Sequence, residues 1–163
     1  MIEPGRKARA FRARDQHGET HTLKDYHGHW LVLYFYPRDN TPGCTKEACQ
    51  FNDLLKDIQK LGAKVLGVSP DSEKSHLKFA DKFNLSFPLL ADQRNKDDEP
   101  RICKAYGVWQ EKKNYGKTYM GIVRTTYIID PEGRVAHRFD RVKADGHAEK
   151  VLHKLNELMA QPA

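Results

Sequence analysis

The stretch Trp30-Leu-Val-Leu-Tyr-Phe-Tyr36 is the longest apolar run in this chain of 163 residues. A continuous run of leucine, valine and aromatic residues of this length is typical of a strand buried on both faces of a sheet. Pro37 ends the run, because proline lacks the N–H group that a strand ladder needs. The run is far too short to span a bilayer. It therefore predicts the central strand of an α/β domain.

Strand and helix signals alternate on both sides of this run. Further strands are expected at 20–23, 63–69, 87–91, 125–130 and 135–139. Helices are expected where apolar residues recur three and four positions apart, over 48–61 with a stop at Gly62, over 77–83 and over 148–158. This order gives a β-α-β half followed by a β-β-α half. It predicts a thioredoxin-like α/β fold, with a central mixed β-sheet flanked by helices and an added N-terminal β-hairpin.

The chain shows no internal repeat and no low-complexity linker, so residues 1–163 are expected to form one domain. Two long connections, 92–100 and 110–119, are expected to be loops, and long loops in compact domains are often functional.

The composition excludes several classes of function. Charged residues make up 31% and hydrophobic residues 39% of the chain, which is typical of a soluble globular domain. The net charge of +6 is not accompanied by a nucleic-acid-binding motif, so a basic surface that aids solubility or steers acidic partners is expected. No signal peptide or membrane span is visible, which favours the cytoplasm and argues against permanent disulfides among the three cysteines. Cysteine chemistry is therefore expected to be transient and catalytic.

Cys44 stands where the loop after the central strand becomes a helix, the place where open α/β sheets bind ligands. That position is expected to expose the sulfur to a substrate. Free backbone N–H groups and the positive end of the helix dipole favour the thiolate, which is the reactive form. The alternative is that Cys44 packs as a small buried hydrophobe, the commoner use of a free cysteine.

Core packing does not explain Cys49, which a helix would place about 160° from the centre of the apolar face. In an intact helix the Cα atoms of Cys44 and Cys49 would stand about 8 to 9 Å apart. A disulfide needs less than about 7 Å. If the two thiols react, the first turn of the helix has to unwind, so we expect local unfolding on oxidation.

Zinc binding is the competing use of paired thiols. Structural zinc sites usually have Cys-x2-4-Cys pairs and four ligands, and only Cys103 remains. The histidines that could complete such a site fall in or beside turns and are expected to be exposed: His17, His21, His27 and His29. No metal site is expected.

The run Tyr36-Pro-Arg-Asp-Asn-Thr-Pro-Gly-Cys-Thr-Lys-Glu-Ala-Cys49 resembles the signature of peroxiredoxins of the Q type, also called bacterioferritin comigratory proteins. The resemblance covers nearly the whole chain, including Tyr115-Gly-Lys-Thr-Tyr-Met-Gly-Ile-Val-Arg-Thr-Thr126 and the strand that ends at Asp130. The chain departs from the family at Ala8-Arg-Ala-Phe11, where a proline is common, and in a longer charged loop before Cys103. Neither departure touches the expected chemistry.

Carried over by position, the resemblance implies that Cys44 is the peroxidatic cysteine and Cys49 the resolving cysteine. Thr41 would contact the thiolate and the peroxide, and Arg124 would be the active-site guanidinium. Pro42 would shield the sulfur from bulk water. A guanidinium also suits the chemistry, because negative charge develops when an O–O bond breaks.

Gly43 and Glu47 complete the expected site as supporting residues. Glu47 either hydrogen-bonds Arg124 and holds it in place or only stabilises the helix dipole from the first turn, and the sequence favours neither use. Cys103 is an alternative resolving cysteine, against the simpler interpretation that it packs in a short helix with Ala105 and Tyr106.

The resemblance implies a thiol peroxidase for antioxidant defence. It would reduce hydrogen peroxide and alkyl hydroperoxides through a Cys44 sulfenic acid and a Cys44–Cys49 disulfide, with thioredoxin or a similar dithiol as reductant. It implies no metal, haem, flavin or other cofactor. A cysteine pair within one helix permits resolution inside one chain, so a monomer is expected.

Two other functions would use the same thiols. One is a redox sensor or a protein-binding module that exposes a surface when oxidised. The other is a disulfide reductase, which normally carries Cys-x-x-Cys, whereas four residues separate the cysteines here. Peroxide consumption coupled to thioredoxin and its reductase separates the three hypotheses.

Overall fold

Five strands form one central mixed sheet in the computed structural model, which describes residues 1–161. Their spatial order is β5 (Leu89–Ala91), β4 (Ala63–Ser69), β3 (Trp30–Phe35), β8 (Thr125–Ile129) and β9 (Val135–Phe139). The first three run parallel, whereas β8 is antiparallel to both β3 and β9. The predicted central strand therefore lies in the middle of the sheet, and the predicted thioredoxin-like α/β class is confirmed.

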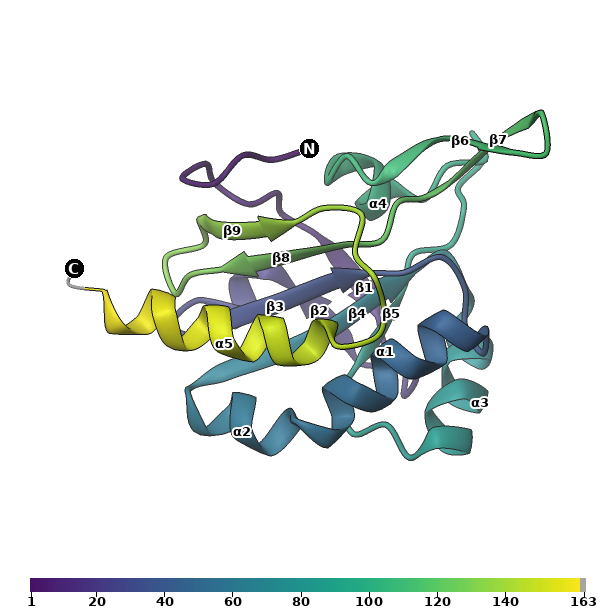
Figure 1. Ribbon diagram of the computed structural model, residues 1–163. Coiled ribbons are helices and arrows are strands. Elements are labelled where there is room, and N and C mark those ends of the chain that lie inside the picture. The colour runs from purple at the N-terminus through teal and green to yellow at the C-terminus, as the bar shows by residue number, and fades with distance from the viewer. Residues whose placement is uncertain (162–163) are drawn as a thin grey trace.

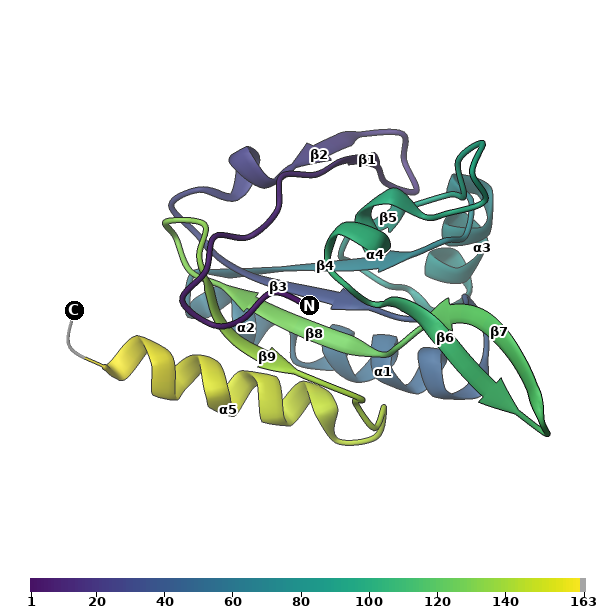
Figure 2. The same cartoon turned by 90° about the horizontal axis from the view of Figure 1, so that it is seen from above.

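Helices cover the sheet on two sides. They are α1 (Pro42–Asp53), α2 (Leu55–Lys60), α3 (Glu73–Phe83), α4 (Arg101–Ala105) and α5 (His147–Ala160). Figure 1 shows α1, α2 and α5 on one face of the sheet. In Figure 2 the predicted N-terminal hairpin, β1 (Arg12–Arg14) with β2 (Thr20–Thr22), lies with the 3-10 helix η1 (Leu23–Tyr26) on the other face. In the described part of the chain, no helix is long and apolar enough to cross a membrane.

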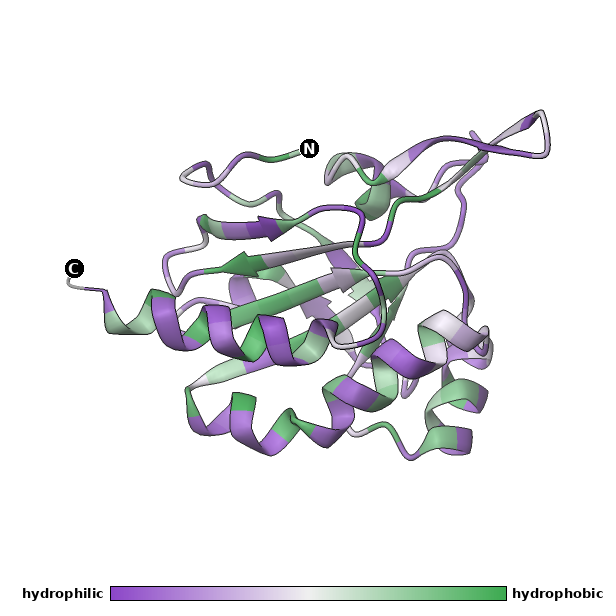
Figure 3. Cartoon of the chain, in the orientation of Figure 1, coloured by the Kyte–Doolittle hydropathy of each residue, from purple (hydrophilic) through white to green (hydrophobic). Residues whose placement is uncertain are grey.

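Alternate side chains of β3 enter two separate cores, because successive residues of a strand point to opposite faces. Val32 and Tyr34 belong to the core under α1, α2 and α5. Leu31, Leu33 and Phe35 belong to the core under α4 and the N-terminal segment. The central strands are accordingly coloured largely as hydrophobic in Figure 3. Burial of β3 on both sides explains why its sequence is continuously apolar rather than alternating.

The single helix expected over 48–61 is interrupted in the structure. The backbone of Leu54, at φ −96° and ψ 3°, separates α1 from α2. Beside this break the side chain of Asn52 donates to the carbonyl of Asn84 and accepts from the N–H of Ser86. These two bonds tie the end of α1 to the segment after α3, and the apolar spacing alone did not reveal this constraint.

The expected loop at 110–119 is wrong, because this segment forms most of a hairpin of β6 (Trp109–Asn114) and β7 (Lys117–Ile122). Its two-residue turn has positive φ at Tyr115 (51°) and Gly116 (77°), the geometry that fits the twist of paired strands. The hairpin extends away from the sheet in Figures 1 and 2. The polar composition of both strands, which are largely exposed, concealed them from the sequence analysis.

Phe51 is a central residue of the core between the sheet and α1. Its side chain is fully buried, and its ring lies 4.7 Å from that of Tyr34, centroid to centroid. We expect Phe51→Ala to lower the free energy of unfolding by about 3 to 5 kcal/mol in urea titrations. Leu77→Ala, at an exposed position of α3, is the control and is expected to stay within about 0.5 kcal/mol of the parent chain. Equal losses in the two variants would contradict this account of the core.

Candidate active site

The site forms where β3 ends and α1 begins. Thr41 is the N-cap of α1 in extended conformation, and Pro42 occupies the first helical position, where its missing N–H is not needed. Cys44 follows in the first turn of the helix. The predicted position of the cysteine at the start of a helix after the central strand is therefore confirmed.

Arg124 lies directly against the sulfur. It precedes β8, the strand beside β3, and its Nη2 atom donates to Cys44 Sγ over 3.2 Å. The second nitrogen, Nη1, donates to Glu47 Oε1 over 2.6 Å. One guanidinium thus joins the thiol and the carboxylate, and of the two uses expected for Glu47 the geometry favours the one that holds Arg124 in place.

Gly43 gives the guanidinium room. A Cβ atom at this position would lie 3.3 Å from Arg124 Nη2 and 3.9 Å from the Cβ of Ala144. The first of these contacts is tighter than most packed side chains allow, so a larger residue would displace the arginine. The expected supporting role of Gly43 therefore has a steric basis.

Glu47 is a buried carboxylate with one partner. Its Oε2 atom has no hydrogen-bond partner among the described residues. Burial raises the pKa of Glu47 to about 7, although the charge of Arg124 and its hydrogen bond act in the opposite direction. The ion pair with Arg124 is therefore complete only above neutral pH.

Cys44 is more buried than expected, with 2% of its surface exposed. The expectation that its position alone exposes the sulfur is wrong. Cys44, Ala48 and Phe51 share one face of α1 and the same core, because residues four and seven positions apart lie on the same side of a helix. Little of the sulfur is therefore accessible to a reactant while the first turn of α1 keeps this position.

Cys49 lies off the buried face of α1, as predicted, and is partly exposed. Burial, with a smaller contribution from the negative charge of Asp53, raises the pKa of this thiol. All three cysteines are free. Because Cys44 and Cys49 belong to one uninterrupted helix, they are not placed for a disulfide without unwinding.

The hydroxyl of Thr41 does not bond the Cys44 sulfur, whose hydrogen-bond partner among the described residues is Arg124. The hydroxyl of Thr41 donates to the carbonyl oxygen of Arg38 over 3.0 Å, a local acceptor three residues earlier. Pro42 is exposed at the start of the helix. Both residues set the geometry of the loop and the first turn.

Cys103 lies on the opposite face of the sheet. It belongs to the core under α4, whereas Cys44 belongs to the core under α1. The backbone N–H of Cys103 donates to Asp92 Oδ2 over 2.7 Å, and the side chain is fully buried. The alternative that Cys103 resolves Cys44 is therefore incompatible with this fold.

One of the four histidines considered for zinc is not exposed as expected. His21 is partly buried, and its ring nitrogens lie 2.7 Å from Asp15 Oδ2 and 2.7 Å from the hydroxyl of Tyr26. His17, His27 and His29 are exposed as predicted. Within residues 1–161, two clusters of side chains are spaced so that they could hold a metal, and neither includes a cysteine: Asp15 with Glu19 and His21, and Asp39 with Asp71 and His76.

The sequence analysis missed two parts of the site. Gln50 of α1 donates to Asp145 and accepts from the N–H of Gly146, which ties α1 to the start of α5. Asp39 and His76 form a buried pair beneath the loop before α1. A signal for this pair was present, because His76 shares the apolar face of α3 with Phe79, where a polar residue needs a partner.

Known proteins share this sequence and geometry. Residues 4–138 match the AhpC/TSA family. Peroxiredoxin Bcp of Bacillus subtilis is 47% identical over 96% of this chain and 97% of its own length. Peroxiredoxin Bcp of Escherichia coli K12 is 40% identical, over 96% and 97% of the two chains.

Solved structures agree with these relatives. A cysteine-to-serine variant of PrxQ from Xylella fastidiosa superposes with a TM-score of 0.88 at 40% identity, covering 96% of this chain and 97% of that one. The bacterioferritin comigratory protein of Xanthomonas campestris, studied for alkyl peroxide reduction, gives a TM-score of 0.82 at 45% identity, covering 90% of each chain.

The raised pKa of Glu47 predicts how its contribution to stability depends on pH. Between the unfolded value of 4.5 and the folded value of about 7, the folded chain binds more protons than the unfolded chain. The free energy of unfolding therefore falls as the pH rises through this window. Glu47→Gln lacks this titration, so its stability relative to the parent chain is expected to rise by on the order of 3 kcal/mol from pH 4.5 to pH 8.

Urea titrations of both proteins across this range measure the difference. Glu132→Gln, at an exposed turn position, is the control, and its difference from the parent is expected to stay nearly constant. If the free energy of unfolding changes with pH in the same way for the parent and Glu47→Gln, then Glu47 does not titrate in this window.

Proposed function

The chain belongs to the AhpC/TSA family as a peroxiredoxin of the Bcp or PrxQ type, and we propose that Cys44 is its peroxide-attacking thiol and Cys49 its resolving thiol. It is a thiol peroxidase, an oxidoreductase. The assignment of Cys44 rests on one observation above all, the 3.2 Å contact between its sulfur and the guanidinium of Arg124. A cationic donor at this distance stabilises a thiolate.

In the first step the Cys44 thiolate attacks one oxygen of a hydroperoxide. An S–O bond forms and the O–O bond breaks, so the sulfur is oxidised to a sulfenic acid and the peroxide is reduced. The leaving oxygen takes up a proton and departs as water or an alcohol. Arg124 stabilises the negative charge that develops on the two oxygens, and Glu47 keeps its guanidinium oriented.

In the second step the Cys49 thiol attacks the sulfenic sulfur. An S–S bond forms, and the hydroxyl group leaves as water. This requires the helix between the two cysteines to open, because their spacing in α1 is too long for a disulfide. The partial exposure of Cys49 leaves it few packing contacts to break during this movement.

In the third step an external dithiol attacks the disulfide, becomes oxidised itself and returns both cysteines to thiols. Thioredoxin or a similar protein is the proposed reductant. Hydrogen peroxide and alkyl hydroperoxides are the proposed substrates, in line with the Xanthomonas campestris relative studied for alkyl peroxide reduction. No step requires a second copy of the chain, so residues 1–163 are proposed to act as one domain and as a monomer.

The remaining predicted residues support the first turn of α1. Thr41 holds the loop through Arg38 and becomes a donor to bound peroxide if its hydroxyl turns toward the sulfur. Pro42 fixes the start of the helix, and Gly43 leaves room for Arg124.

Replacement of each cysteine tests the assignment. Cys44→Ser is expected to abolish peroxide consumption coupled to thioredoxin and its reductase, because serine supplies no thiolate. Cys49→Ser is expected to consume one equivalent of peroxide and then to stop or slow strongly, because its sulfenic acid has no partner. Cys103→Ser is the control and is expected to turn over normally, since Cys103 lies on the other face of the sheet. Turnover by Cys44→Ser at the parent rate would refute the proposal.

Opening of α1 predicts faster amide exchange in the oxidised protein. We expect amides across 45–51 to exchange faster in the disulfide form than in the reduced form, because the helical hydrogen bonds there have to break. Hydrogen exchange read by mass spectrometry or NMR measures this, with the amides of α5 as an internal reference. Equal protection of 45–51 in both forms would exclude the unwinding step.

A further inference from the structure

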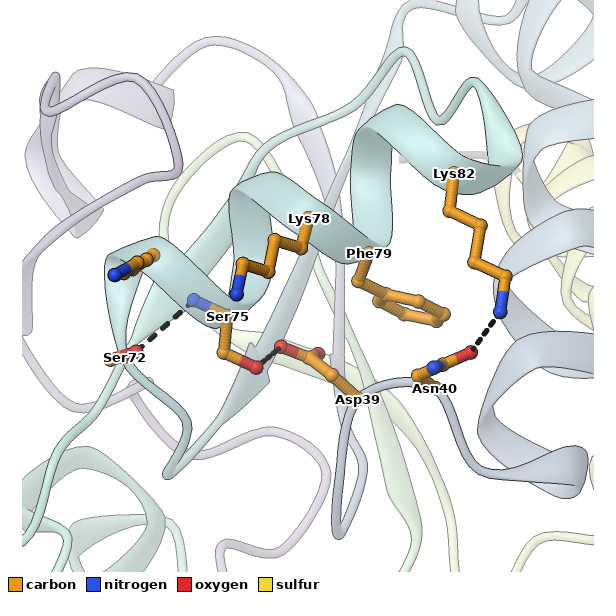
Figure 4. Close-up of a pocket in the computed structure, with 8 residues that line it drawn as sticks. Asp39, Asn40, Ser72, Ser75, Lys78, Phe79 and Lys82 are labelled. Atoms are coloured by element: carbon orange, nitrogen blue, oxygen red, sulfur yellow. Dashed lines mark hydrogen bonds between the residues drawn. The ribbon is translucent and has the colours of Figure 1, made fainter.

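A buried cluster of polar side chains lies beneath the loop that leads into α1. The carboxylate of Asp39 is 4% exposed and accepts three hydrogen bonds. Its Oδ1 atom accepts from the hydroxyl of Tyr36 over 2.5 Å, and its Oδ2 atom lies 2.8 Å from Ser75 Oγ and 2.7 Å from His76 Nδ1. Figure 4 shows Ser75 of α3 pointing at Asp39 across the groove between helix and loop.

The ring of His76 has a hydrogen-bond partner at each of its two nitrogens. Its Nε2 atom lies 2.9 Å from the carbonyl oxygen of Leu90, which can only accept. Its Nδ1 atom faces the carboxylate of Asp39, which also accepts from the hydroxyls of Tyr36 and Ser75. The fully buried ring is therefore fixed at both of its nitrogens, between Asp39 and the backbone of β5. A second carboxylate, Asp71, accepts from the backbone N–H of Asp39 over 2.8 Å.

These bonds fix the loop at Asp39. A groove of about 560 Å³ separates the loop at Asp39 and Asn40 from the exposed side of α3. Across it, Lys82 donates to the side chain of Asn40 over 3.4 Å, as Figure 4 shows. Asn40 itself has a positive φ of 57°, a conformation that costs free energy and persists only when its neighbours fix it.

Asp39 is the last buried residue before α1. At the other end of the reactive segment, Gln50 is tied to Asp145 and Gly146. The part of α1 that has to open for disulfide formation lies between these two anchors. The upstream anchor therefore sets how easily the first turn leaves the position in which Arg124 contacts Cys44.

We propose that His76 is a positioning residue that, through Asp39, holds the first turn of α1 closed over the peroxide-reacting thiol. The inference rests on the proposed roles of Cys44 and Cys49. His76 favours the closed turn, in which Cys44 meets Arg124 and reacts with peroxide, over the open turn, in which Cys49 reaches the sulfenic sulfur. Weakening the contact between His76 and Asp39 is expected to slow the reaction of Cys44 with peroxide and to speed disulfide formation. General destabilisation of the fold does not change these two rates in opposite directions.

The test measures the two steps separately in single turnovers. Reduced protein is mixed with hydrogen peroxide and quenched, and mass spectrometry after thiol alkylation and dimedone labelling counts thiol, sulfenic acid and disulfide. In His76→Asn we expect sulfenic acid to form about tenfold to a hundredfold more slowly, the scale of loss when a reacting group is misplaced by about 1 Å. We expect disulfide formation from the sulfenic acid to become severalfold faster.

Ser75→Ala is the second variant. It removes one donor to Asp39 and leaves the contact between Asp39 and His76 in place, and it carries the test even if His76→Asn does not fold. The same opposite changes, smaller in size, are expected. Rates that are unchanged, or that both fall, in folded Ser75→Ala or His76→Asn protein would overturn the proposal.

His21→Asn is the matched control. His21 also bonds an aspartate and lies beside a tyrosine hydroxyl, Asp15 and Tyr26, but it belongs to the N-terminal hairpin. Both rates are expected to stay within twofold of the parent even if its melting temperature falls. If Cys44→Ser still reacts with peroxide, the proposed function itself is contradicted. If Cys44→Ser does not react and folded His76→Asn has unaltered rates, only the role of His76 is contradicted.

Discussion

The contact of Arg124 with both Cys44 and Glu47 is the constraint on which the site depends. The guanidinium belongs to the segment before β8, 77 residues from Glu47 and 80 from Cys44 along the chain. It reaches them because β3, which leads into α1, pairs with β8 in the middle of the sheet. The apolar run of β3 therefore does more than fill the core. Because this strand pairs with β8, Arg124 is the cation that meets the thiol.

Two requirements conflict at the start of α1. Activation of Cys44 favours an intact helix, because Arg124 and the helix dipole act on the sulfur only in that geometry. The proposed resolution by Cys49 favours an open helix. The fold places the conflict in a short segment, since Asp39 is bonded upstream and Gln50 downstream, while Pro42 at the start of the helix is exposed. Local unfolding can then occur without loss of the core formed by Phe51 and Tyr34.

The sequence predicted what depends on local pattern and on the family resemblance. Hydrophobic periodicity and turn residues predict the central strand, the order of strands and helices along the two halves of the chain, and the start of a helix at Cys44. The depth of Cys44 did not follow, because burial depends on Arg124 and on the neighbouring elements packed over the helix. The β6–β7 hairpin was missed because exposed strands carry no apolar alternation, although Tyr115-Gly116 is a hairpin turn. The Asp39–His76 pair was missed because it joins residues 37 positions apart through tertiary contact alone.

The position of Cys103 determines how many oxidised forms the chain can have. Three thiols allow three pairings, and a protein that sampled all of them would have to sort correct from incorrect disulfides after each turnover. Here the sheet itself separates Cys103 from the other two, and burial together with the neighbouring charge of Asp92 raises the pKa of its thiol well above the usual range. In the proposed cycle, Cys49 is therefore the one disulfide partner that this fold leaves to Cys44 within the chain.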